Sequence, residues 1–145
     1  MEDTELAQEI RAIKHEFMAF RNGIVSDTLR KAGMDCYKVI FGLNLPQLGE
    51  IARRHSNTKE LAEALWSDRG VRESRLLATY LYPHDSIDID SAMAMMNDVQ
   101  TREEADILCF RLLRKLPFAR DLLTRHADNS PLPQYSKTAL ARNLE

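Results

Sequence analysis

The sequence predicts an all-α protein built as a stack of antiparallel helical hairpins, and two observations lead to that prediction. Apolar residues recur along nearly the whole chain at the spacing of an α-helix, and no segment alternates with the shorter period of a strand. Capping residues, glycines and prolines divide this pattern into about seven or eight helices joined by short links. Similarity between successive helix pairs is weak, so a compact orthogonal bundle is the structural alternative.

The N-terminal half contains successive apolar stripes, each bounded by a residue that favours a helix end. They run from Leu6 to Ile24, Val25 to Ala32, Leu45 to Ala52, Leu61 to Trp66 and Val71 to Leu81. Gly33 is expected to end the second helix, since glycine accepts the left-handed backbone that follows many helices. Asn44 is expected to cap the third helix, whose first turn holds Pro46. Asn57 is expected to cap the fourth, in which Trp66 faces the core.

The C-terminal half continues the same helical pattern. Asp88 is expected to cap a Met-rich helix that runs through Met93, Met96 and Val99. Thr101 and Glu104 have the spacing of a capping box and predict the start of the next helix. Pro117 separates that helix from its successor, because proline cannot continue a helix.

Length, charge and cysteine content restrict the class of protein. A chain of 145 residues holds one core, so residues 1–128 are assigned to a single domain and residues 129–145 to a partly helical C-terminal tail. The net charge of −2 means that nucleic-acid binding would require a local basic patch. Cys36 and Cys109 are expected to be free thiols, and with no signal or membrane segment the protein is expected to be cytoplasmic. The four histidines lack metal-ligand spacing, so no metal or cofactor is expected.

Asp106 is the candidate functional residue. On a helical wheel it falls beside the apolar stripe formed by Leu108, Cys109 and Leu112, with Arg102 one turn before it. A carboxylate at this boundary can face a groove while its helix stays anchored in the core. The same spacing also suits an ordinary surface ion pair between Arg102 and Asp106, and the pattern alone leaves both interpretations open.

Three stretches together resemble the DNA alkylation repair family, the AlkD-like glycosylases with HEAT-like repeats. They are IFGLNLPQLGEIA at 40–52, LAEALW at 61–66 followed by GVRESRLLA at 70–78, and DVQTREEADILC at 98–109. The first two consist mainly of packing residues and indicate the fold. The third contains Asp106 and indicates the chemistry.

The resemblance implies a HEAT-like α-α superhelix whose concave face holds duplex DNA. It also implies a single catalytic carboxylate, matched by Asp106, that stabilises positive charge on the sugar while a cationic N-alkylated base leaves. Arg102 stands where the family has a tryptophan, and later helices of the family have no counterpart in the sequence. Glycosylase activity is therefore left open, and the alternative is a non-catalytic helical scaffold that binds a protein or peptide in the same groove.

Basic residues are candidates for contact with DNA phosphates. The selected positions are Arg53, Arg72, Arg75, Arg102 and Arg111. Arg75, within the family-like RESR segment, is the strongest of them, while pairing with Glu73 or Glu104 is its structural alternative. Solvated helix faces carry similar charge excesses, so the basic set by itself does not establish DNA binding. A short repeat array also has apolar ends, which makes a homodimer or another protein partner a further expectation.

Overall fold

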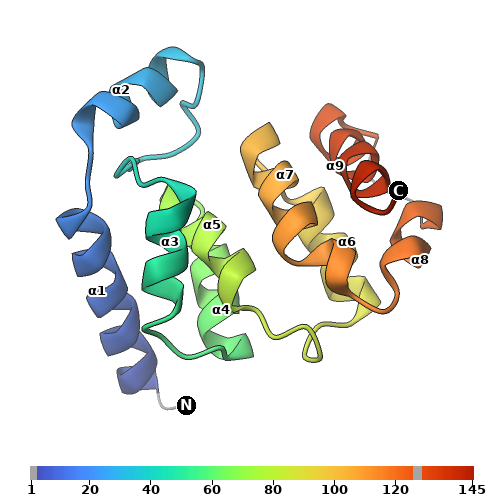
Figure 1. Cartoon of the computed structure of the whole chain (residues 1–145), viewed down its shortest axis with the longest axis horizontal. Helices are drawn as coiled ribbons and strands as arrows, with labels where there is room; N and C mark the ends of the chain where they lie inside the picture. The colour runs from blue at the N-terminus through green and yellow to red at the C-terminus, as the bar shows by residue number, and fades with distance from the viewer. Residues whose placement is uncertain (1–2, 126–128) are drawn as a thin grey trace. The chain divides into compact units, whose positions relative to one another are not determined.

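The computed structural model describes residues 3–125 and 129–145, and within these ranges the regular structure is helical (Figure 1). The one isolated bridge found in the described ranges joins Val39 and Val71. This result confirms the all-α prediction. None of the described helices is long and apolar enough to cross a membrane. The chain divides into two compact units, Met1–Tyr82 (unit 1) and Pro83–Glu145 (unit 2).

Unit 1 is built around a pair of adjacent helices. Its helices are α1 (Asp3–Ala19), α2 (Gly23–Lys31), α3 (Leu45–Ala52), α4 (Lys59–Ser67) and α5 (Arg72–Leu81). Helices α4 and α5 pack against each other, α3 packs on α5, and α1 packs on α4 (Figure 1, blue to yellow-green). The fully buried Leu48, Leu61 and Leu77 contribute one side chain each from α3, α4 and α5 to the core. Their helical spacing within the sequence is what places them on the inner faces.

Unit 2 carries the candidate residue Asp106. Its helices are α6 (Ile89–Asn97), α7 (Arg102–Arg111), the short 3-10 helix η1 (Leu113–Lys115), α8 (Ala119–Thr124) and α9 (Pro131–Asn143). Helix α9 packs along α7 and also contacts α6 and α8. The C-terminal segment, predicted to be a partly helical tail, is thus helical over 13 residues. Pro131 occupies its first turn, and Ala139 and Leu140 are buried, which explains why the segment folds onto α7.

Several predicted helix ends are confirmed. Asn44 accepts a hydrogen bond from the Gln47 backbone N–H at 2.9 Å and forms a complete capping box with it. Asp88 accepts from the Ser91 backbone N–H at 2.7 Å at the start of α6. Gly33 follows the end of α2 with a φ of 102°, the left-handed conformation that favours glycine.

Other boundaries differ from the predictions. Helix α1 ends at Ala19, so Ile24 does not continue its apolar stripe but lies at the start of α2 with 80% of its surface exposed. The cap of α4 is Thr58 rather than Asn57, since the Thr58 hydroxyl accepts from the Leu61 backbone N–H at 3.3 Å. Adjacent polar residues are equally good caps by composition, so the sequence could not choose between them.

A buried carboxylate fixes the turn that leads into α3. The Glu73 oxygens accept hydrogen bonds from the backbone N–H groups of Phe41 (3.0 Å), Gly42 (3.0 Å) and Leu43 (3.3 Å). Glu73 also receives a charge-assisted bond of 2.6 Å from Arg72 Nη1. Because Glu73 is fully buried, these donors replace the water that its charge would otherwise require.

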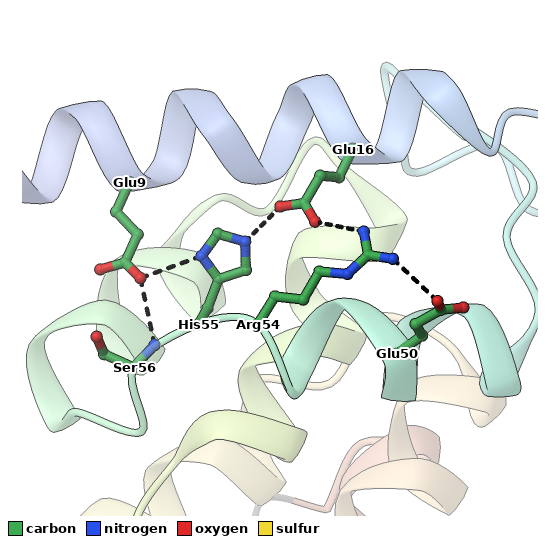
Figure 2. A network of polar contacts seen from close by, with 6 residues as sticks. All are labelled: Glu9, Glu16, Glu50, Arg54, His55 and Ser56. Atoms are coloured by element: carbon green, nitrogen blue, oxygen red, sulfur yellow. Dashed lines mark hydrogen bonds and ion pairs between the residues drawn. The ribbon is translucent and has the colours of Figure 1, made fainter.

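A second polar network ties α1 to the end of α3 (Figure 2). The two ring nitrogens of His55 face carboxylates of α1, Nδ1 at 3.1 Å from Glu9 and Nε2 in contact with Glu16. Arg54 bridges Glu16 at 3.1 Å and Glu50 at 2.9 Å. The side chains of Arg54 and His55 thus hold α1 against the segment that follows α3.

Candidate nucleic-acid interface

The start of α7 is fixed by side-chain hydrogen bonds. The Thr101 hydroxyl accepts from the Glu104 backbone N–H at 3.0 Å, as the predicted capping box requires. The buried Glu104 carboxylate accepts from the Gln100 backbone N–H at 2.9 Å, one residue before the expected partner. This anchoring sets the rotation of α7, and with Ala105 and Leu108 fully buried, Asp106 lies on the exposed face.

The partner of the Asp106 carboxylate is a tyrosine of α9. The Tyr135 hydroxyl lies 2.9 Å from Oδ1 and 3.1 Å from Oδ2, so it donates to both carboxylate oxygens. The guanidinium carbon of Arg102 lies 5.0 Å from the centre of the Tyr135 ring, within cation–π range. Arg142, on α9, is exposed and close enough for its charge to act on the phenol. We call Arg102, Asp106, Tyr135 and Arg142 the Asp106 cluster.

The Asp106 charge changes the titration of two neighbouring side chains. Its hydrogen bond raises the pKa of Tyr135 above the ordinary value, with smaller contributions from burial and from the negative charge itself. The positive charges of Arg142 and Arg102 oppose that shift. Burial chiefly, and the Asp106 charge in addition, raise the pKa of the Cys109 thiol to about 12. Tyr135 therefore stays a hydrogen-bond donor at neutral pH, and Cys109 stays an unreactive thiol.

An aromatic and another cation extend the exposed face of α7. Phe110 follows Asp106 by one turn and is 50% exposed, which is unusual for a large apolar side chain. The Arg114 guanidinium carbon lies 4.3 Å from the Phe110 ring centre, and its Nε donates to the Phe110 carbonyl at 2.6 Å. The face thus presents Arg102, Asp106 and Phe110 in succession along α7, with Tyr135 beside them.

The structure assigns Arg102 a different contact from the one that spacing suggested. Its guanidinium lies over Tyr135 rather than in an ion pair with Asp106, although the two residues are one helical turn apart. Sequence reasoning missed Tyr135, which the tail assignment left without a role. The available signal was the spacing of Tyr135 and Arg142, which puts them on one side of any helix that spans both.

Two of the predicted phosphate-binding arginines are structural instead. Arg75 is fully buried, with its guanidinium 3.5 Å from the Trp66 ring centre and Nη1 donating to the Trp66 carbonyl at 2.6 Å. Arg72 is 4% exposed and donates to Glu73 and to the Leu43 carbonyl at 3.0 Å. A DNA phosphate can contact only surface side chains. The prediction that Arg72 and Arg75 bind phosphates is therefore wrong. The burial of Trp66 agrees with its predicted place in the core.

The remaining candidates lie in different units. Arg53 is exposed and forms the C-cap of α3 in unit 1. Arg111 is half-buried at the end of α7 in unit 2, where it shares its helix with Arg102 and Asp106. The contacts within unit 2 therefore bring together Arg102 and Asp106 from the predicted site and add Tyr135 and Arg142 to them.

The fold and the site define an all-α protein of packed helices that presents an exposed acid, Asp106, on a helix face beside a tyrosine and an arginine. The family model for DNA alkylation repair enzymes matches residues 23–132, which is most of the chain and includes Asp106. The chain therefore belongs to the DNA alkylation repair enzyme family. No curated protein and no solved structure matches it. Tyr135 and Arg142 lie beyond the matched segment.

Proposed function

We propose that this protein binds duplex DNA through the exposed face of α7 and α9 and releases cationic N-alkylated bases, with Asp106 as the catalytic carboxylate. Membership of the DNA alkylation repair family supports the substrate class. The observation that carries the proposal is an exposed carboxylate whose two oxygens share the single Tyr135 O–H, with the charges of Arg102 and Arg142 acting on the same phenol. Because the Asp106 side chain is exposed, a ligand can reach it.

The proposed chemistry needs one anion and one water molecule. The bond between the sugar C1′ and the glycosidic nitrogen of the alkylated base breaks, and the base leaves as a neutral molecule with both bonding electrons. The sugar then carries the positive charge, which the Asp106 carboxylate stabilises. Water adds to C1′ and gives up a proton, for which the same carboxylate is the acceptor.

The side chains around Asp106 suit the rest of a nucleotide. Arg102 and Arg142 provide positive charge for phosphates, and Phe110 offers an exposed ring on which a base or sugar can pack. Counting only the charged members of the Asp106 cluster, two arginines and one aspartate leave an excess of positive charge. This local excess supports DNA binding despite the overall charge of −2.

Base release from methylated duplex DNA tests the proposal. We expect the native protein to release N-methylated purines and leave abasic sites. Asp106→Asn keeps the size of the side chain but removes its charge, and it should slow release by about 100-fold, the typical loss for one electrostatic group. Asp121→Asn is the matched control, because Asp121 is also an exposed acid of unit 2 and should leave the rate unchanged.

Two results would contradict the proposal. Equal release by the native protein and Asp106→Asn would remove Asp106 from the chemistry. Absence of both release and DNA binding by the native protein would favour the other candidate, a helical scaffold that binds a protein or peptide. The partly exposed Phe110 on the α7 face is the feature that such a partner would contact.

A further inference from the structure

Arg102 and Asp106 are opposite charges one turn apart on α7, yet each is held by Tyr135 instead of by the other. The phenol hydroxyl occupies the carboxylate at 2.9 and 3.1 Å, and the ring lies 5.0 Å from the guanidinium carbon. Tyr135 reaches this position from α9, which packs along α7. A single side chain therefore contacts both charges.

On an isolated helix the same two residues would attract each other. Side chains one turn apart are neighbours, and an arginine and an aspartate at that spacing form an ion pair. Such a pair would engage the guanidinium that a phosphate needs and would offset the negative charge that a sugar cation needs. The tyrosine ring gives Arg102 a different contact, while the hydroxyl holds the carboxylate in one orientation.

We propose that Tyr135 is a positioning residue that keeps Arg102 and Asp106 apart, so that one nucleotide meets a cation and an anion that are not paired with each other. This inference rests on the proposed function, because it concerns how the Asp106 site receives its substrate. The expected ligand carries both charges at once: an anionic phosphate for Arg102 and a cationic alkylated base and its sugar for Asp106. Unmodified nucleotides supply only the first of these.

Titration of the Tyr135 phenol tests the geometry without DNA. The absorbance change on ionisation is isolated by subtracting the spectrum of Tyr135→Phe, since the chain has four tyrosines. Asp106→Asn should lower the pKa of Tyr135, because it removes the hydrogen bond that raises it most. Arg102→Ala should raise that pKa further, because the Arg102 charge lowers it. An unchanged titration in Arg102→Ala would overturn the inference.

Second-site rescue tests the role of Tyr135 in the reaction. Release is measured in a single turnover at saturating protein, so that affinity for DNA does not enter the rate. Tyr135→Ala frees Arg102 to pair with Asp106 and should slow release about two- to fivefold, the range expected of an exposed ion pair one turn apart on a helix. Adding Arg102→Ala to the Tyr135→Ala variant should return the release rate to the native value. Arg102→Ala alone should not accelerate release.

The outcomes separate this inference from the proposed function. The inference is supported if Arg102→Ala raises the release rate only in the Tyr135→Ala background. A purely structural role of Tyr135 would not produce that rise. If the native protein releases base and Arg102→Ala acts equally in both backgrounds, the inference is overturned while the proposed function stands. If the native protein releases no base, both are overturned.

Discussion

Substitution of Glu73 by glutamine is expected to destabilise unit 1 strongly. The carboxylate is fully buried and accepts from three backbone N–H groups at 3.0 to 3.3 Å and from Arg72 at 2.6 Å. Glutamine has nearly the same shape but replaces one acceptor oxygen by an NH2 group, which then faces donors. The substitution also removes the negative charge that lies 2.6 Å from the buried Arg72 guanidinium.

The expected loss is about 3 to 5 kcal/mol, the usual effect of removing one partner from a buried ion pair. That is a large part of the total stability of a domain, which is typically about 5 to 15 kcal/mol. Urea unfolding followed by tryptophan fluorescence measures it, because Trp66 is the one tryptophan of the chain and lies in unit 1. The matched control is Glu50→Gln, whose side chain is 46% exposed and paired with Arg54, and it should cost less than about 1 kcal/mol.

A loss of under about 1 kcal/mol for Glu73→Gln would refute this reasoning, because a buried acceptor with several donors cannot be replaced so cheaply. Equal losses for Glu73→Gln and Glu50→Gln would do the same, since burial is the property that distinguishes the two carboxylates.

Further substitutions and reagents test other parts of the structure. Gly42→Ala should destabilise the protein by more than about 1 kcal/mol in thermal unfolding, because Gly42 has a φ of 93° and an added Cβ would lie 2.4 Å from a backbone oxygen. The control Gly23→Ala should not destabilise it, because the space around Gly23 is open. In the folded protein a thiol reagent should modify the exposed Cys36 but not Cys109, whose pKa burial raises to about 12, and both should react after unfolding. His55→Ala should cost about 1 to 3 kcal/mol and speed proteolysis within α1, because it removes the ring that contacts two α1 carboxylates. An unchanged melting temperature for Gly42→Ala or His55→Ala, or modification of both thiols at equal rates, would contradict these expectations.

Features that depend on contacts within one helical turn could be predicted from the sequence. The helix starts at Asn44 and Asp88 were predictable because a capping side chain bonds to a backbone group within the next turn. The position of Asp106 beside a buried stripe followed from helical spacing in the same way, since Ala105 and Leu108 are fully buried.

Contacts between distant segments could not be read from the sequence. Arg75 has the composition of a phosphate-binding residue, but its environment is set by Trp66 on the preceding helix. The partner of Asp106 comes from α9, and nothing near Asp106 in the sequence indicates Tyr135. Arginine and tyrosine are long side chains with apolar and polar parts, so their surroundings depend on tertiary packing.

The dissociation constant for duplex DNA as a function of salt concentration tests the central claim most directly, because both catalysis and damage recognition require the α7 and α9 face to hold DNA. Binding should weaken steeply with salt, and replacing Arg102 and Arg142 together by alanine should reduce the slope of log K against log salt by about 2, one for each lost phosphate contact. Replacing the exposed Arg11 and Arg21 of unit 1 removes the same charge and should leave that slope unchanged. Equal slopes for the native protein and the Arg102 and Arg142 double variant, or no binding at low salt, would contradict the account.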